Sequence, residues 1–187
     1  PQVKYGADVI SRIQAAREPE VALDMKQEVR AVLAKGIRQF REKQPGVSNE
    51  ELCMMVGANT TMVYLLLGVD PAELGRAPFR AGHLGMQEFS IDGVKGATFP
   101  GLSAFVGADI TAGILASRMT EQQETSMLVD LGTNGEIALW KDGILYVTST
   151  AAGPAFEGAD IECGMGGVKG AISSITEEGL NLKVQTI

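Results

Sequence analysis

The sequence predicts an α/β protein with a mixed sheet, in which a helical first part precedes a strand-rich second part. Apolar residues from Val21 to Phe40 recur at spacings of three and four, which is the pattern of an amphipathic helix. Apolar runs at 127–131, 136–140 and 144–149 follow one another with turn residues between them, as in an antiparallel meander. A polar connector at 120–125 separates these two patterns, and we place a subdomain boundary there.

Two helices are predicted near the start of the chain. A short helical pattern covers residues 6–17 and is interrupted at Pro19, and the longer helix that begins at Val21 ends at Pro45–Gly46. The charged side chains on its other face are expected to be solvated and predict no binding surface. The apolar face of the long helix consists of Val21, Met25, Val29, Val32, Leu33, Ile37 and Phe40.

Two segments of the first part share one design, in which a strand ends, small residues follow and a helix begins. Residues 51–56 are a candidate buried strand, and Gly57–Thr61 then turns into a short helix. Ser103–Val106 is a second candidate strand, and Gly107–Thr111 leads into a helix through Ala116. The glycine- and proline-rich stretch at 71–101 predicts loop with short strands.

The second part is expected to continue with a helix and two strands. Residues 151–158 open a helix, with Pro154 suited to its first turn. The glycine-rich cluster at 164–170 lacks the Gly-Lys-Ser/Thr ending of a Walker loop and is a weak nucleotide signal. Strands follow at 171–175 and 180–187.

The segment from Met127 to Trp140 carries the most information. Its two apolar runs predict a β-hairpin, with Asn134–Gly135 supplying the turn. The tip holds a carboxylate, a hydroxyl, an amide and glycines, which are groups that bind a phosphate and its Mg²⁺. An ordinary polar turn explains these residues equally well, and only their position relative to other motifs favours the phosphate site.

Several polar residues have both a chemical and a structural interpretation. Asp109 could hold a metal-bound water or accept a proton, but a helix N-cap is the favoured role from spacing alone. Asn59 and Thr60 are likewise interpreted as caps. Glu157 could reach a ligand or complement the positive end of its own helix.

Composition excludes some classes of function. The chain of 187 residues has a net charge of −7, so no basic surface for nucleic acid is expected. No apolar run reaches membrane-spanning length and no signal peptide is recognisable, so the protein is expected to be cytoplasmic. Cys53 and Cys163 are expected to be buried free thiols, and His83 alone cannot form a zinc site. The start at Pro1 and the final strand pattern suggest an internal fragment of a longer protein.

Two motifs resemble the superfamily of actin, sugar kinases and heat-shock ATPases. Gly107–Ala116 is similar to its first connecting helix, and Leu128–Ile137 is similar to its second phosphate-binding hairpin. The resemblance implies a partial ribonuclease H-like, actin-like ATPase fold. Residues 1–125 would be the remainder of the first subdomain with a helical insertion, and 126–187 the start of the second.

Four other motifs resemble the ATPase domain of the reductive activators of corrinoid proteins. They are Tyr5–Ile13, Gly57–Met62, Leu67–Pro71 and Ser149–Ala159. The resemblance implies an ATP-dependent, one-electron reduction of Co(II) to Co(I) in a partner corrinoid protein, fed by an electron donor. It also implies an iron–sulfur cluster in a domain that is absent from this chain, because no cysteine cluster is present.

Site residues follow from the same resemblance. Asp109 is assigned a catalytic role, and Asp109 with Asp130 would position Mg²⁺, directly or through water. The first phosphate hairpin and the adenosine motif of the family are missing from this chain, so it is not expected to hydrolyse ATP alone. The predicted cofactor-binding residues are Asp130, Gly132, Thr133, Asn134, Gly135, Glu136, Gly153 and Glu157.

Two alternatives remain open from the sequence. One is a non-catalytic protein-interaction module that keeps the fold and has lost nucleotide binding. The other is a small-molecule kinase, although no sugar-binding polar cluster is recognisable. A sheet with exposed edges would also favour self-association, which leaves a homodimer as an option.

Overall fold

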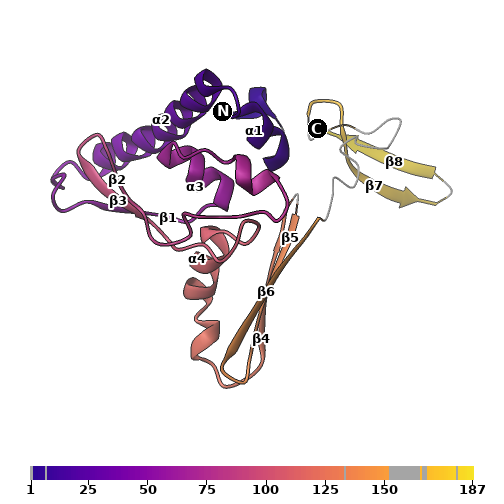
Figure 1. Cartoon of the computed structure of the whole chain (residues 1–187). Coiled ribbons are helices and arrows are strands. Elements are labelled where there is room, and N and C mark those ends of the chain that lie inside the picture. Colours follow the sequence, from indigo (N-terminus) through magenta and orange to yellow (C-terminus); the bar gives the residue numbers. More distant parts are fainter. Residues whose placement is uncertain (1, 7, 133, 152–164, 166–167, 180) are drawn as a thin grey trace. The chain divides into compact units, whose positions relative to one another are not determined.

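The computed structural model describes the chain apart from residues 1, 7, 133, 152–164, 166–167 and 180. It divides into two compact units (Figure 1): residues 1–130 with 136–149, and residues 131–135 with 150–187. Both helices and sheets are present, which confirms the predicted α/β class. No helix in the described part of the chain is long and apolar enough to cross a membrane.

The first unit begins with the helices that the sequence predicts. A 3₁₀ turn, η1 (Gln2–Tyr5), precedes α1 (Val9–Ala15), and α2 (Pro19–Lys43) follows. The side chain of Asp8 accepts the backbone N–H of Ser11 and so caps α1, and Pro19 occupies the first turn of α2, where its missing N–H costs nothing.

The packed face of α2 rotates along its length, because the helix contacts different partners at its two ends (Figure 1). Met25 packs with Leu65 of α3 (Thr60–Leu67), whereas Ala34 and Ile37 belong to a core with Leu66, Ile91 and Val94. The prediction that all the apolar residues of this helix lie on one buried face was therefore wrong in part. The exposed fractions are 49% for Val32 and 41% for Phe40.

A three-stranded mixed sheet completes this core. β1 (Cys53–Val56) runs parallel to β3 (Val94–Thr98), and β2 (Glu88–Ile91) pairs antiparallel with β3, so the strand order is β1-β3-β2. The expectation of a buried strand at 51–56 is wrong: β1 is an edge of this described sheet, and exposed residues alternate with half-buried ones. Cys53 is a free thiol but an exposed one, which corrects its predicted burial.

Residues 103–106 form a tight turn, which corrects the strand expected there. The Ser103 hydroxyl oxygen accepts the N–H groups of Phe105 (3.3 Å) and Val106 (3.0 Å). The Val106 carbonyl in turn accepts the N–H groups of Leu102 and Ser103. A serine side chain thus replaces a strand partner as the acceptor for these donors.

The predicted meander is confirmed as a sheet in the order β4-β5-β6, with β4 (Ser126–Leu131), β5 (Asn134–Lys141) and β6 (Ile144–Ala151). The β5–β6 turn has both central residues at positive φ, 52° at Asp142 and 77° at Gly143, which suits a hairpin. This sheet packs on α4 (Ala108–Ser117) and on the 3₁₀ turn η3 (Met119–Glu121). The buried residues of that core are Val106, Ile110, Ile114, Met119 and Ala138.

The second unit contains an antiparallel hairpin of β7 (Ile172–Glu178) and β8 (Asn181–Thr186), as the sequence predicts. Its register shifts between Ile172 and Ser174. Residues 152–158 of the expected helix, and residues 164, 166 and 167 of the glycine-rich cluster, lie outside the described residues. Ala151, where that helix was expected to begin, is the last residue of β6.

Candidate functional site

Two loops of the first unit interlock and position the N-terminus of α4. The N–H of Asp109 donates to the carbonyl of Ala58 (3.2 Å), which joins α4 to the loop between β1 and α3. A Cβ on Gly57 would lie 2.9 Å from the Cβ of Ala112, and one on Gly107 would lie 2.6 Å from the Cα of Asn59. Glycine at both positions is what lets the two backbones approach so closely.

Asp109 is the second residue of α4 and not its N-cap, which is Gly107. Its Oδ1 accepts the N–H of Ile110 (2.9 Å), so the carboxylate still satisfies a donor in the first turn. The N-cap role that spacing favours for Asp109 is thus wrong. The N-cap lies two residues earlier, at Gly107, because the close approach of the two loops requires glycine there. Asn59 does cap α3, accepting the N–H of Met62 (2.9 Å), whereas the Thr60 hydroxyl donates to the Ser103 carbonyl (2.7 Å).

Three carboxylates of the first unit are linked by charge: Asp130 near the end of β4 acts on Asp109 of α4, and both act on Glu136 of β5. We name Asp109, Asp130 and Glu136 the carboxylate group. Burial raises the pKa of Asp109, and the charge of Asp130 raises it further against two backbone hydrogen bonds that lower it. Burial likewise raises the pKa of Glu136, opposed by a hydrogen bond from Ser149 (3.1 Å) and reinforced by the charges of Asp109 and Asp130. Such a group attracts a cation, because a positive charge would relieve the mutual repulsion.

The carboxylate group offers oxygen donors, which are the ligand type that Mg²⁺ prefers. Mg²⁺ is usually bound by one or two carboxylates together with phosphate oxygens and waters. Across the described residues, no three histidine, cysteine or carboxylate side chains come close enough to hold one ion. Asp109 and Asp130 as magnesium ligands therefore stay a prediction, one that requires phosphate oxygens to complete the site.

The hairpin tip differs from the predicted turn. Asn134 and Gly135 belong to β5, so the turn assigned to Asn134–Gly135 is wrong. The N–H of Gly132 donates to the Asn134 carbonyl (2.9 Å), and Gly135 is buried. Thr133, Gly153 and Glu157 lie outside the described residues, so their assignment to a nucleotide also stays a prediction.

Ser149 is a site residue that the sequence reasoning missed. A two-residue turn at Asp142–Gly143 places Lys141 opposite Ile144, and the same count places Glu136 opposite Ser149. The hairpin register was therefore the signal that could have found the Glu136–Ser149 hydrogen bond.

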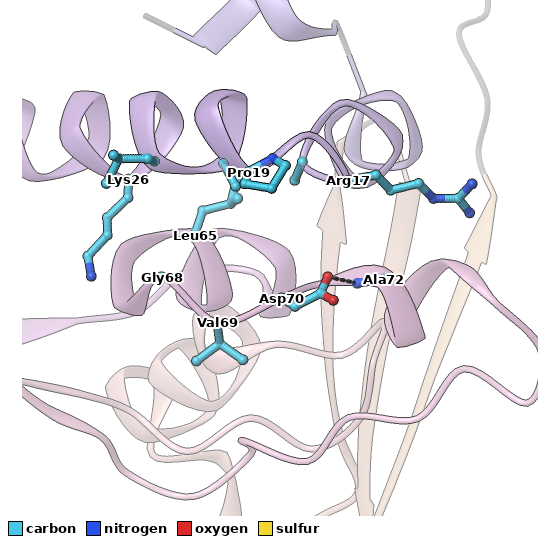
Figure 2. A pocket seen from close by; sticks show the side chains of 11 residues that line it. Arg17, Pro19, Lys26, Leu65, Gly68, Val69, Asp70 and Ala72 are labelled. Atoms are coloured by element: carbon cyan, nitrogen blue, oxygen red, sulfur yellow. Dashed lines mark hydrogen bonds between the residues drawn. The ribbon is translucent and has the colours of Figure 1, made fainter.

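A separate cavity of about 440 Å³ lies between the start of α2 and the end of α3 (Figure 2). Its charged lining residues are Arg17, Lys26 and Asp70, and most of the remaining wall is apolar. None of the carboxylate group lines this cavity.

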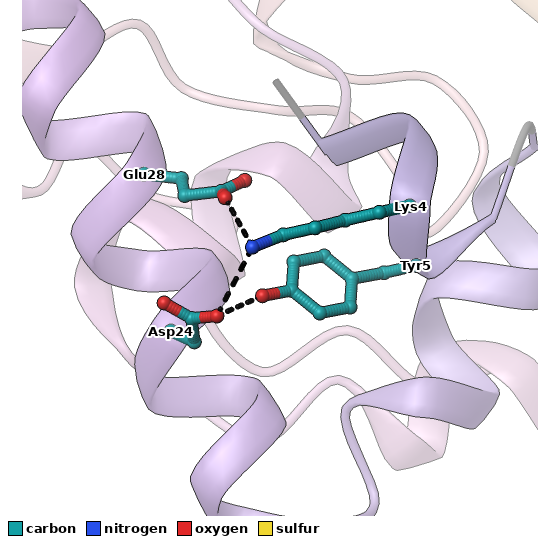
Figure 3. Close-up of polar contacts among 4 residues, drawn as sticks. All are labelled: Lys4, Tyr5, Asp24 and Glu28. Carbon is teal, nitrogen blue, oxygen red and sulfur yellow. Dashed lines mark hydrogen bonds and ion pairs between the residues drawn. The ribbon is translucent and has the colours of Figure 1, made fainter.

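A polar cluster fastens η1 to α2 (Figure 3). The Lys4 ammonium contacts Glu28 (2.7 Å) and Asp24 (3.3 Å) and lies over the Tyr5 ring, whose hydroxyl donates to Asp24. These contacts raise the pKa of Lys4, chiefly through Glu28, and raise that of Tyr5 through Asp24. Each of the four side chains has a partner within the cluster, although the Oε2 atom of Glu28 is buried without a hydrogen bond. Such pairing is typical of a structural contact.

Comparison with known proteins identifies the class and then the family. The model described as the C-terminal domain of RACo, the ASKHA domain, matches residues 124–187, and the model of the RACo middle region matches residues 1–122. The chain belongs to the RACo family and carries part of its ASKHA domain. The proposed boundary between residues 125 and 126 stays a prediction.

Individual relatives agree with this assignment. The chain is 38% identical to the corrinoid activation enzyme RamQ of Eubacterium limosum over 93% of its own length and 30% of that protein. It is 40% identical over 80 residues to the [Co(II) methylated amine-specific corrinoid protein] reductase of Methanosarcina barkeri, covering 43% of the chain and 15% of that protein.

A solved structure titled reductive activator for corrinoid, iron–sulfur protein matches with a TM-score of 0.73 and 32% identity. The match covers 99% of this chain and 31% of the solved one. The chain therefore spans about a third of the length of two of these relatives, and it shares the fold of the solved one over almost its whole extent.

Proposed function

We propose that the chain is part of an ATP-dependent reductive activator of corrinoid proteins. In this proposal, ATP binding or hydrolysis is coupled to the reduction of Co(II) to Co(I) in a partner corrinoid protein. The observation that carries it is the 32% identity, over 99% of the chain, to a solved reductive activator. The carboxylate group, contributed by α4, β4 and β5, would be the part of this chain that holds the Mg²⁺ of ATP.

Asp109 and Asp130 would hold the Mg²⁺ of the nucleotide or orient the attacking water. Bound MgATP would supply the free energy for the unfavourable reduction. A cation beside Asp109 favours its ionised form, so binding would return its raised pKa towards the ordinary range and release any proton held there. Glu136, whose carboxylate accepts a hydrogen bond from Ser149, would be a further nucleotide-binding residue of this group.

The hairpin tip would contact the phosphates. The predicted contacts are the Thr133 hydroxyl and backbone N–H groups from Gly132 to Gly135, with Asn134 beside them. Because the Gly132 N–H is bonded to the Asn134 carbonyl, its use for a phosphate would require that bond to open. Gly153 and Glu157 complete the proposed nucleotide-binding residues.

Coupling requires that the nucleotide change the surface shown to the corrinoid partner, since a ligand shifts a conformational equilibrium only through differential binding. We place the iron–sulfur cluster and the contact with an electron donor in a further domain of the longer protein. A cytoplasmic location and a homodimer complete the proposal, the latter because β1 is an open edge of its described sheet.

The test is calorimetric titration of MgATP and MgADP into the full-length protein, together with spectroscopic measurement of Co(I) formation in the partner. Asp109→Asn and Asp130→Asn should each weaken nucleotide binding and slow ATP-dependent reduction. Asp142→Asn is the matched control, because it removes a carboxylate from the same sheet at the exposed β5–β6 turn and Asn tolerates its positive φ.

Each result has a defined meaning. Unchanged reduction by either site variant would exclude the role given to that residue. Absence of nucleotide binding by the wild-type protein would favour the interaction module instead. Phosphoryl transfer from ATP to a small molecule would favour the kinase.

A further inference from the structure

The cavity between α2 and α3 has an apolar wall and a cationic end. Leu65, with an exposed fraction of 2%, points from α3 towards α2 and forms part of the wall with Ala16 and Pro19 (Figure 2). The volume of about 440 Å³ is within the range of sites for small organic ligands. Nothing in the proposed nucleotide site uses this cavity.

Lys26 gives the cavity its charge. Its stem lies against Gly68, where an added Cβ would be 2.8 Å from Cδ and 2.6 Å from Nζ, so the ammonium is held by packing. Lys26 is half-buried, and no carboxylate or carbonyl of the described residues accepts a hydrogen bond from it. A half-buried ammonium without an acceptor favours an anion from outside the chain.

The other charged lining residues do not neutralise Lys26. Oδ1 of Asp70 accepts the N–H of Ala72 (2.9 Å), so this carboxylate is engaged in the turn after α3. Arg17 lies at the opposite end of the cavity, and its exposed guanidinium points away from Lys26 (Figure 2). One anionic group near Lys26 and an apolar body along Leu65 would match this lining.

We propose that this cavity binds a small organic anion, a carboxylate on an apolar body, with the carboxylate at Lys26. The ligand would bury its apolar part between α2 and α3 and give the ammonium its missing acceptor. The proposal is independent of ATP and of corrinoid activation. It also revises the expectation that the charged face of α2 is only solvated.

The rival explanation is that Lys26 complements the negative C-terminal end of α3, where cations are stabilising. Under that explanation the side chain would affect stability and have no effect on ligand affinity. The two roles are separable by measuring both quantities in one set of variants.

The experiment titrates 4-phenylbutyrate into the ¹⁵N-labelled full chain and follows the backbone amide signals. The neutral 4-phenylbutanamide tests the charge of the ligand without any mutation. Lys26→Gln removes the proposed anchor, and Lys35→Gln is the matched control because Lys35 is an exposed lysine elsewhere on α2.

We expect saturable shifts at Gly68, Val69 and Ala72, about tenfold weaker binding by Lys26→Gln, and no change for Lys35→Gln, since a hydrogen bond to a charged group typically contributes that much. The neutral 4-phenylbutanamide should bind the wild type as weakly as 4-phenylbutyrate binds Lys26→Gln. Equal binding of acid and amide, shifts confined to other elements, or a lower melting temperature of Lys26→Gln with unchanged affinity would each overturn the proposal.

Discussion

Gly107→Ala tests the interlocking of the two loops that position Asp109. An added Cβ would lie 2.6 Å from the Cα of Asn59 and 2.8 Å from the backbone N of Thr60. Both are backbone atoms that cannot rotate aside. The Gly107 backbone, at φ −88° and ψ −171°, is open to alanine, so the whole cost is steric.

Overpacking of this kind costs about 1–3 kcal/mol, and the two backbone contacts place Gly107→Ala in the upper part of that range, at about 2–3 kcal/mol. For a chain of this size, each kcal/mol lowers the melting temperature by about 2–4 °C, which predicts a fall of about 4–12 °C. The displaced α4 should also weaken nucleotide binding through Asp109.

The assay is thermal and urea unfolding followed by far-UV circular dichroism. Gly36→Ala is the matched control: Gly36 is exposed within α2 and an added Cβ meets nothing within 4 Å. That substitution should stabilise by about 0.5–1 kcal/mol through helix propensity. If Gly107→Ala were as stable as the wild type, the close approach would not constrain α4 and the argument would be wrong.

Three further predictions concern charge and capping. Asp109→Asn should raise the free energy of unfolding at neutral pH. Burial, and then the charge of Asp130, raise the pKa of the Asp109 carboxyl in the folded state. The ionised carboxylate therefore destabilises the wild type fully above that raised pKa, and not at all below the ordinary pKa of an aspartate. Urea midpoints across pH measure this, and a gain that persists in acid would contradict it. Asp24→Asn should lower the pKa of Tyr5, because the hydrogen bond to Asp24 raises it; ultraviolet titration of the phenol would disprove this if the curve did not move. Asn59→Ala should cost about 1 kcal/mol by removing the cap of α3, whereas Asn59→Ser should recover most of it; equal midpoints for the two variants would argue against a capping role.

Much of the candidate site was predictable because its elements are encoded locally. The helix from residue 108 and the three meander strands follow from apolar periodicity, and the turn at Asp142–Gly143 follows from residues that accept positive φ. The family resemblance then assigned site roles to Asp109 and Asp130. Whether either contacts nucleotide still depends on the titrations proposed above.

Two of the incorrect predictions have a common physical cause. The expected strand at Ser103–Val106 is a turn because the backbone N–H groups of Phe105 and Val106 donate to the Ser103 hydroxyl oxygen. Asp109 is not an N-cap because glycine is required at position 107, where two backbones approach closely. In each case, the competing partner was a contact that apolar periodicity and spacing do not report.

The sequence by itself determined the order and type of most elements, the capping role of Asn59 and the family resemblance, since all of these depend on neighbouring residues. Only the tertiary structure decided which faces are covered, that Cys53 is exposed, and that Asp109, Asp130 and Glu136 share one electrostatic environment. It also showed the cavity beside Lys26. Burial and the interaction of charges depend on segments far apart in the chain, and their approach is decided by packing of the whole unit.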